Sequence, residues 1–324
     1  MDIALIVIQL AFGALGLHFG AEWLVSGSSK LALSFGVKPL IIGLTLVAFG
    51  TSAPELTVSM TSALQGSADL SVGNVIGSNI ANIGLVLGIA ALLKPIRVDA
   101  EVFRRDLPAM LFVAFLIAVL PFIGGPVQQG DSVVFMLDRW KAAVLIGVLG
   151  FVLFRMFRGA KSEGDEKPEP MSARRRMTLG ALTVVGLGFL LVGGTLFVEG
   201  AVSAAQMLGV PELVIGLTVL AIGTSLPELA TSIVAIIRGE SAIGLGNVVG
   251  SNIFNVCMVL GLVSLISPLA IDAQVMRLDM IVMLAFTALL ALLAWQKRTI
   301  SRIEGVALIG LYVLYVTNLF VGWL

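Results

Sequence analysis

Charged side chains are scarce in this chain of 324 residues, of which 12% are Asp, Glu, Lys or Arg and 58% are hydrophobic. Soluble globular domains carry about 25% charged residues. Together with a mean hydropathy of +1.05, this composition excludes a soluble domain and predicts a polytopic membrane protein. Lys and Arg number 20, as do Asp and Glu, so no basic excess is available for binding nucleic acid.

Histidine and cysteine occur only once each, as His18 and Cys257. A lone cysteine cannot form an internal disulfide, and its apolar surroundings predict a small buried side chain. One histidine excludes a metal site built from several imidazoles. The chain also lacks a His-Glu-x-x-His motif and a nucleophile elbow, so we expect neither enzymatic activity nor a cofactor.

Ten apolar segments have about the length of 20 residues that is needed to cross a bilayer. The one long polar interval, residues 158–177, is rich in Pro, Gly and charges of both signs, which predicts a flexible linker. It separates a first half, 1–157, from a second half, 178–324. The expected spans are 3–29, 38–64, 71–93, 107–125, 139–157, 178–205, 212–237, 242–266, 276–295 and 304–322.

Lys and Arg are distributed unevenly over the joints between these spans. In membrane proteins they cluster on cytoplasmic loops. With ten alternating spans and the N-terminus outside, seventeen of the 20 fall on inner joints, and only Arg139, Lys141 and Arg277 fall on outer ones. We therefore expect a multi-pass protein of the cytoplasmic (inner) membrane, with both termini outside and the linker in the cytoplasm.

The two halves share an internal repeat. Residues 40–95 align without a gap on residues 213–268, with 27 identities over 56 positions. Five spans in each half, an odd number, give the halves opposite orientations in the membrane, as in many secondary transporters. The predicted fold is thus an all-α polytopic membrane protein of ten transmembrane helices, arranged as two inverted five-helix repeats.

Each repeat places a carboxylate inside an apolar segment. The motif Gly-Thr-Ser-x-Pro-Glu occurs at 50–55 and again at 223–228. Because a Glu in hydrocarbon costs ~3 kcal/mol or more, Glu55 and Glu228 are candidate functional residues. The adjacent Gly and Pro should break the helices and free backbone carbonyls, which are tolerated at membrane depth only where they line a cavity or bind something. We expect these carbonyls at Ala48 and Ala221.

Further polar residues recur at four-residue steps, which place them on one helix face. The sets are Thr51, Glu55 and Ser59, then Asn74, Ser78 and Asn82, and their counterparts Thr224, Glu228 and Ser232, then Asn247, Ser251 and Asn255. Such oxygen donors suit hard cations, and Ca²⁺ accepts 6–8 of them in adaptable geometry. A structural seam of hydrogen bonds between helices is the alternative, but it does not account for the paired Glu.

These two motifs, Gly-Thr-Ser-x-Pro-Glu and Gly-Asn-Val-x-Gly-Ser-Asn-Ile, resemble the alpha-repeats of the calcium/cation antiporter superfamily, specifically those of prokaryotic sodium/calcium exchangers. The resemblance covers both halves. It implies alternating access between a sliding two-helix bundle and a core, with sodium entry driving calcium extrusion, and we expect a monomer to be functional. Proton/calcium or other cation antiport is the alternative, followed by a cation channel.

The resemblance also implies a set of ion ligands. Glu55 and Glu228 would bind calcium and share sodium, with hydroxyl, carbonyl and central amide oxygens completing the site. In this sequence these oxygens belong to Thr51, Ser52, Ser78, Thr224, Ser225 and Ser251 (hydroxyls), Ala48 and Ala221 (carbonyls), and Asn82 and Asn255 (amides). Some relatives, among them potassium-dependent exchangers, carry Asp in place of Asn255, so we expect transport here to be independent of potassium.

Overall fold

The computed structural model describes residues 3–129, 132–158, 171–209 and 221–321. In the first half, the elements are α1 (Ile3–Ser34), α2 (Pro39–Ile42), η1 (Gly43–Val47), α3 (Ala48–Thr51), α4 (Ala53–Leu64), α5 (Ala68–Ala81), η2 (Asn82–Leu87), α6 (Gly88–Leu93), β1 (Ile96–Arg97), η3 (Val102–Asp106), α7 (Leu107–Val119), η4 (Leu120–Phe122), β2 (Pro126–Gln129), β3 (Ser132–Leu137) and α8 (Arg139–Arg158). The elements η1, η2 and η3 are π-helical turns, and η4 is a 3-10 turn.

The second half repeats much of this order. Its elements are α9 (Ala173–Met207), α11 (Ala221–Gly223), α12 (Leu226–Ile237), α13 (Ser241–Phe254), η6 (Asn255–Leu260), α14 (Gly261–Ile266), β4 (Leu269–Asp272), α15 (Ala273–Arg277), α16 (Asp279–Lys297), β5 (Thr299–Ile300) and α17 (Arg302–Val321). The element η6 is a π-helical turn, as η2 is in the first half.

Nine helical stretches within the described ranges are long and apolar enough to cross a membrane, and the shorter apolar helix α12 is a further one. They match nine of the expected spans within a few residues. The remaining expected span, 212–237, lies partly outside the described residues, and α11 and α12 account for the rest of it. The fourth span begins at Val102 instead of residue 107, because Arg105 and Asp106 pair with each other inside the helix.

The linker expected at 158–177 is partly helical. The helix α9 begins at Ala173, where the Ser172 hydroxyl accepts the Arg175 N–H at 3.3 Å. Serine at this position satisfies a backbone donor that has no partner within the helix. Residues 173–177 therefore belong to α9, while 159–170 lie outside the described residues.

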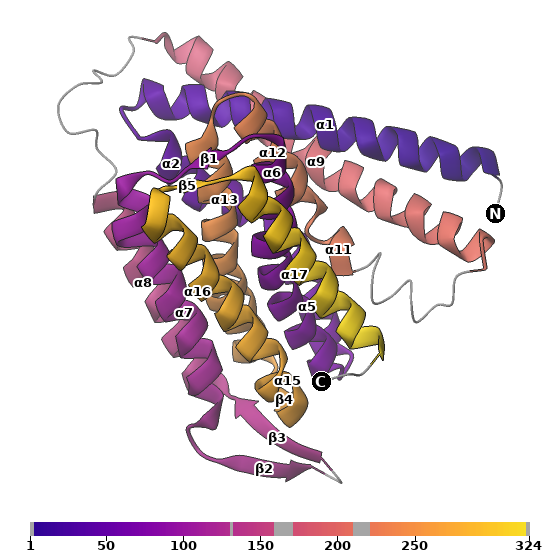
Figure 1. Cartoon of the computed structure of the whole chain (residues 1–324). Coiled ribbons are helices and arrows are strands. Elements are labelled where there is room, and N and C mark those ends of the chain that lie inside the picture. The colour runs from indigo at the N-terminus through magenta and orange to yellow at the C-terminus, as the bar shows by residue number, and fades with distance from the viewer. Residues whose placement is uncertain (1–2, 130–131, 159–170, 210–220, 322–324) are drawn as a thin grey trace.

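The long helices α1 and α9 run antiparallel, side by side, across the remaining bundle (Figure 1). Glycines allow their backbones to approach closely: a Cβ added at Gly20 would lie 2.4 Å from Leu190 N, and one at Gly186 would lie 2.5 Å from Leu24 N. Small residues are the usual means of close helix packing in membranes. These two helices thus form one layer against the other helices.

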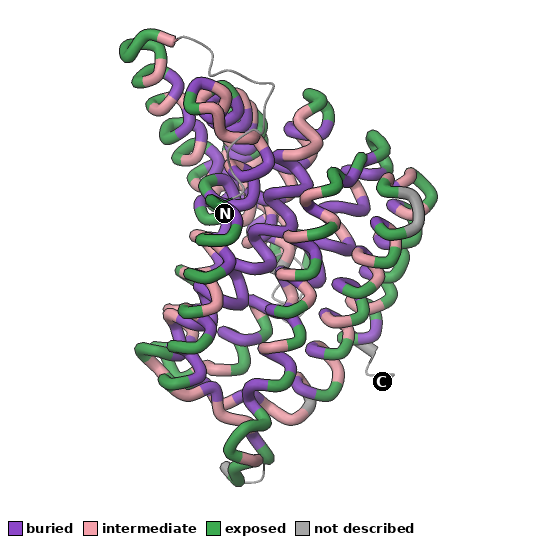
Figure 2. Tube along the Cα trace, turned by 90° about the vertical axis from the view of Figure 1, so that its left-hand side faces the viewer, coloured by how far each residue is buried: buried purple, intermediate pink, exposed green. Residues whose placement is uncertain are grey.

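The centre of the bundle is formed by the segments containing α5 and α13. In their most apolar windows, 78% and 83% of the residues are buried, whereas the figure is 22% in α1. Figure 2 shows buried residues along the inner helices and exposed ones on the peripheral helices. Large apolar side chains such as Phe115 and Leu314 are about 60% exposed, which suits surfaces that face lipid.

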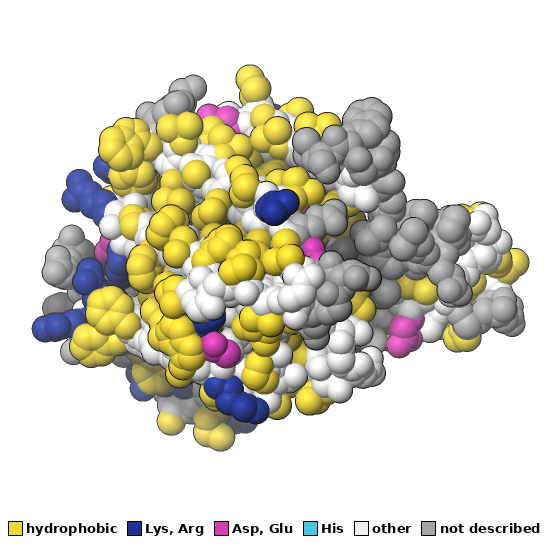
Figure 3. Space-filling view, turned by 90° about the horizontal axis from the view of Figure 1, so that it is seen from below, with side chains coloured by type: hydrophobic (Ala, Val, Ile, Leu, Met, Phe, Trp, Pro, Cys, Tyr) yellow, Lys and Arg dark blue, Asp and Glu magenta, His cyan; other side chains and the backbone are white. Residues whose placement is uncertain are grey.

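Two small antiparallel sheets join the halves at opposite ends of the bundle (Figure 1). In one sheet, β1 pairs with β5 through Ile96 and Ile300; in the other, β3 pairs with β4 through Leu137 and Leu269, and β2 extends that sheet. Leu269 is the repeat counterpart of Ile96, 173 positions later. The sheets are therefore equivalent pairings from inverted halves. Figure 3, which views the end with β2 and β3, shows hydrophobic side chains over much of that face, with basic ones scattered or at its left edge.

Candidate functional site

A helix break precedes each of the twin carboxylates. The helix α3 ends at Thr51 and α4 begins at Ala53, with Ser52 between them at φ −78° and ψ 4°. In the second copy, Ser225 takes φ −89° and ψ 5° before α12. Proline follows both breaks; it lacks an N–H and therefore cannot continue the preceding hydrogen-bond ladder, but it fits the first turn of a new helix.

The carbonyl at Ala48 is engaged within the protein. It accepts the Ser52 N–H at 3.0 Å and the Thr51 hydroxyl at 3.4 Å. In the second copy, the Ser225 N–H donates to Ile222 O at 3.0 Å, one residue beyond the equivalent position, Ala221. The two breaks therefore differ in their backbone hydrogen bonding. The prediction of a free carbonyl at Ala48 is wrong, because this carbonyl keeps its helical partner, the Ser52 N–H.

Glu55 and Glu228 are both completely buried. None of their four carboxylate oxygens has a hydrogen-bond partner, and no ion pair reaches either residue in the part of the chain that the structure describes. A buried ionised carboxylate without a partner costs several kcal/mol. The site therefore requires positive charge, supplied by cations or by protons.

Five hydroxyl groups from both halves surround the carboxylates: those of Ser78, Thr224 and Ser225 near Glu55, and those of Thr51 and Ser251 near Glu228. They also bond to one another. The Thr51 Oγ1 lies 3.3 Å from Ser251 Oγ, and Ser78 Oγ lies 3.4 Å from Thr224 Oγ1. Each bond joins one half to the other, so the site forms only when the inverted repeats meet.

Asn74 and Asn247 hold this arrangement in place. The Asn74 Nδ2 donates to Glu55 O at 3.3 Å and to Ser59 Oγ at 3.0 Å, while its Oδ1 accepts the hydroxyl of Thr224 at 3.4 Å. The counterpart Asn247 makes the same bonds to Glu228 O, Ser232 Oγ and Thr51 Oγ1, at 3.5, 3.1 and 3.1 Å. Each amide thus ties the Glu helix of its own half to a hydroxyl of the other half.

Four further amides bond in pairs at the centre. The Asn82 Nδ2 donates to Asn252 Oδ1, and the Asn255 Nδ2 donates to Asn79 Oδ1, both at 3.1 Å. These amide orientations are those that satisfy the hydrogen-bond network. Because Asn82 and Asn255 use their nitrogens in this way, their Oδ1 atoms remain buried and unpartnered.

Eight buried oxygens at the centre therefore lack a hydrogen-bond partner: Glu55 Oε1 and Oε2, Glu228 Oε1 and Oε2, Ser52 Oγ, Ser225 Oγ, Asn82 Oδ1 and Asn255 Oδ1. Native proteins leave few buried polar atoms unsatisfied, and each needs an explanation. Two carboxylates with amide and hydroxyl oxygens match the ligand preferences of Ca²⁺ and other hard cations. No group of three or more His, Cys, Asp or Glu that could hold a metal occurs among the described residues.

The structure brings the expected polar side chains of both halves together. Ala48 lies beside them, since a Cβ on Gly250 would be 2.7 Å from Ala48 Cβ. Ala221 is placed as the first residue of α11, and nothing is described of its side chain. Sequence reasoning missed Asn79 and Asn252 as parts of the site, although their recurrence in both Gly-Ser-Asn-Ile motifs was a signal.

A polytopic helical fold with a buried oxygen site between inverted halves defines a membrane transport protein. The sequence profile of the family described as "Sodium/calcium exchanger protein" matches residues 5–158 and 178–321. The chain therefore belongs to the sodium/calcium exchanger family, a family of transporters of Na⁺ and Ca²⁺.

Individual relatives agree with this placement. The chain is 37% identical to the inner membrane protein YrbG of Escherichia coli (97% of this chain, 96% of the relative) and 34% identical to the sodium/calcium exchanger MaX1 of Methanosarcina acetivorans (98% and 99%). It superposes on a structure of the sodium-calcium exchanger NCX_Mj soaked with 10 mM Na⁺ and zero Ca²⁺, with a TM-score of 0.84 and 33% identity (98% and 100%). The chain is thus a cation/calcium antiporter built from ten membrane helices in two inverted repeats.

We predict that Asn79→Ala and Asn252→Ala each destabilise the protein by about 1–3 kcal/mol, since each removes the acceptor of a buried amide N–H. By the pseudo-symmetry of the site, the two losses should be similar. Thermal unfolding of the purified protein in detergent measures them. Ser264→Ala is the control, because its buried hydroxyl already lacks a partner and its removal should be neutral or stabilising. Equal unfolding temperatures for all three variants would contradict the assigned hydrogen bonds.

Proposed function

We propose that this protein exchanges sodium for calcium across the inner membrane, without potassium, with Glu55 and Glu228 as the charged ligands. One observation carries the proposal: two fully buried carboxylates face the same centre with no basic partner in the described structure. Two negative charges balance one Ca²⁺, and they equally balance two monovalent cations. One pair of residues can therefore hold either ion species in turn, which is the requirement for exchange.

We infer that the ligands come in symmetric pairs. The carboxylates of Glu55 and Glu228 would be joined by the hydroxyls of Ser52 and Ser225 and by the Oδ1 atoms of Asn82 and Asn255, which are the unpartnered oxygens. The hydroxyls of Thr51, Thr224, Ser78 and Ser251 share hydrogen bonds and would contribute their remaining lone pairs. The carbonyls of Ala48 and Ala221 would complete the set, that of Ala48 by releasing the Thr51 hydroxyl. With no thiolate or imidazole in the set, hard cations are favoured.

Proton/calcium exchange is the second candidate, because the same unpartnered carboxylates could carry protons. Calcium uptake into inverted membrane vesicles distinguishes the two. We expect an imposed sodium gradient to drive uptake at neutral pH, and a proton gradient of equal size to drive little. Uptake driven by a proton gradient alone would indicate proton/calcium exchange instead of sodium/calcium exchange.

We predict that Glu55→Gln and Glu228→Gln each reduce sodium-driven calcium uptake more than about 100-fold. Removing one carboxylate leaves half the charge of a buried divalent ion unbalanced, and an uncompensated buried charge costs about 3–5 kcal/mol. Uptake per amount of protein in vesicles measures the loss. Glu199→Gln serves as the control, since Glu199 lies exposed on α9 and its carboxylate accepts the Gln9 side-chain amide. Near-normal uptake by either site variant at normal protein levels would refute the assignment.

We predict that transport continues when choline replaces potassium, and that Asn255→Asp introduces a dependence on potassium or protons. The parent site carries two negative charges for the two positive charges of calcium. A third carboxylate beside Glu228 would place like charges close together in a poorly solvated site, which must then take up a proton or another cation. The control is Asn82→Ala, which adds no charge.

Sodium-driven uptake across a range of pH and potassium concentrations decides this point. A parent protein that stops without potassium contradicts potassium independence. An Asn255→Asp variant that matches the parent under every condition contradicts the charge-balance argument.

We also propose that both termini face outside, that residues 158–172 join the halves on the cytoplasmic side, and that the monomer is the functional unit. The distribution of Lys and Arg supports the orientation. One chain supplies every ligand of the proposed set, so the site does not need a second copy. This supports a functional monomer.

We predict that a cysteine introduced at Ser162 reacts with a membrane-impermeant thiol reagent in inverted vesicles but not in intact cells. A cysteine at the exposed Gln65, in the turn between α4 and α5, should show the reverse pattern. The parent chain is the background control, because its single cysteine, Cys257, is buried. Reversed labelling at both positions would overturn the orientation and leave the exchange activity untouched.

A further inference from the structure

The two inverted halves do not adopt the same arrangement around their carboxylates. The helix α1 packs along α12, which carries Glu228. The repeat-equivalent contact would place α9 along α4, which carries Glu55, and no comparable packing is found in the part of the chain that the structure describes. The structure is therefore closed over α12 and open over α4.

The face of α12 that α1 covers is apolar. Side chains of α1 belong to a buried cluster, against which three side chains of α12 pack: Leu226, Ala230 and Val234. The equivalent residues of α4, 173 positions earlier, are Ala53, Thr57 and Thr61, and both threonines are exposed. Covering the first face buries apolar surface, whereas covering the second would remove water from two hydroxyl groups. This difference favours α1 on α12 over α9 on α4.

Two polar contacts hold α1 to the turn that follows α12. Arg238 in this turn forms an ion pair with Glu22 of α1, and the Ser29 hydroxyl of α1 donates to Glu240 Oε1 at 3.1 Å. The side chains of Glu22 and Arg238 are 29% and 40% exposed. Because Glu22 and Ser29 are seven residues apart, they lie on one side of α1, about two helical turns from each other. We call these two contacts the latch.

The opposite end of the protein lacks the residues for a latch. Glycines give the register between α1 and α9, since Gly13, Gly20 and Gly27 correspond to Gly186, Gly193 and Gly200, 173 positions later. In the same register, the latch residues Glu22, Ser29, Arg238 and Glu240 correspond to Thr195, Val202, Gln65 and Ser67. None of these four counterparts is charged. The latch is therefore specific to one end.

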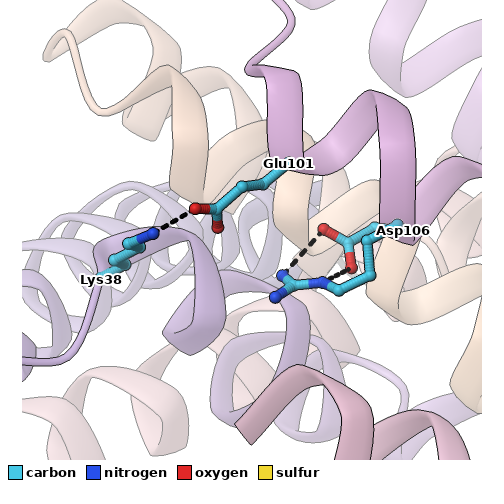
Figure 4. A network of polar contacts seen from close by, with 4 residues as sticks. Lys38, Glu101 and Asp106 are labelled. Atoms are coloured by element: carbon cyan, nitrogen blue, oxygen red, sulfur yellow. Dashed lines mark hydrogen bonds and ion pairs between the residues drawn. The ribbon is translucent and has the colours of Figure 1, made fainter. Parts of the chain in front are cut away.

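The connection after α1 confines a change in the direction of this helix to a few residues. The helix ends at Ser34, and Gly36 follows with φ +66°, a left-handed conformation that glycine adopts without strain. Just beyond, Lys38 pairs with Glu101 and holds the chain against the core, close to the pair of Arg105 and Asp106 (Figure 4). The segment α2 can thus stay in place while α1 leaves α12.

We propose that the latch, together with the apolar face of α12, makes the state closed over α12 the more stable of two states of this exchanger. In the other state, α9 would cover α4 and α1 would leave α12. If the two halves were identical, inverted symmetry would give both states the same free energy, so the residues that break the symmetry set their ratio. The inference rests on the proposed exchange, which requires the carboxylates to open to each side in turn. In the proposed orientation, the latch closes the cytoplasmic side.

Thiol labelling of the purified protein in detergent tests the latch. All variants carry Cys257→Ala, which removes the single native thiol. Ala230→Cys reports how often α1 leaves α12, and Thr57→Cys reports the equivalent position on α4. With choline in place of sodium and a calcium chelator present, neither transported ion shifts the two states. A hydrophilic maleimide should label Thr57→Cys faster than Ala230→Cys.

Glu22→Gln should raise the labelling rate at Ala230→Cys about threefold to fivefold, since a partly exposed ion pair contributes up to a factor of about five. The charge-swapped variant Glu22→Arg/Arg238→Glu should return the rate to within about twofold of the parent, which a misfolded protein would not do. Glu199→Gln is the matched control, because Glu199 belongs to the same helix pair but bonds to Gln9 within that pair. Its labelling rate should equal that of the parent.

A latch can also be built at the opposite end. Thr195→Glu/Gln65→Arg places an acid and a base at the positions equivalent to Glu22 and Arg238. This variant should raise labelling at Ala230→Cys and lower it at Thr57→Cys, because it stabilises the state in which α9 covers α4.

Three results would overturn the proposal: equal rates for Glu22→Gln and the parent, no recovery in the charge-swapped variant, or the same increase for Glu199→Gln as for Glu22→Gln. The labelling rates need no ion gradient and are read separately from calcium uptake. Normal exchange without an effect of the latch residues on labelling would therefore refute this inference alone.

Discussion

Two carboxylates in an apolar bundle without a basic partner are the constraint on which the rest of this structure depends. Glu55 and Glu228 are completely buried, yet no Lys or Arg in the described structure neutralises them. Water is too scarce at this depth to compensate such charge, so mobile cations must do so. A resident arginine would have neutralised the site permanently and removed its capacity for exchange.

The neighbouring amides show how the protein keeps the site open to cations. Asn82 and Asn255 give their N–H groups to Asn252 and Asn79 across the interface between the halves, so their oxygens remain free. Both lie at the first residue of a π-helical turn, a wide turn that is often found at functional sites. The donors are thus consumed within the protein and the acceptors are left at the centre, which makes the site selective for positive charge.

Inverted symmetry is strict at the centre and weaker toward the periphery. Every hydrogen bond of the Asn74 set recurs in the Asn247 set with similar lengths. The Ser52 and Ser225 breaks already differ in their backbone partners, and Asp106 pairs with Arg105 whereas its counterpart Asp279 accepts the Tyr315 hydroxyl. The decrease in symmetry from the centre to the periphery has a physical reason. The centre meets the same ions from both sides, whereas the two membrane faces differ in charge and lipid composition.

The sequence by itself determined the class of protein, the position of most spans, the internal repeat and the twin carboxylates, because hydrophobicity, helix breakers and repeated motifs are local features of the chain. Only the tertiary structure decided the partners: Thr51 with Asn247 and Asn82 with Asn252. These contacts join residues about 170 to 200 positions apart. They depend on how two inverted repeats pack, and helical periodicity within one segment carries no information about which residue it meets in another.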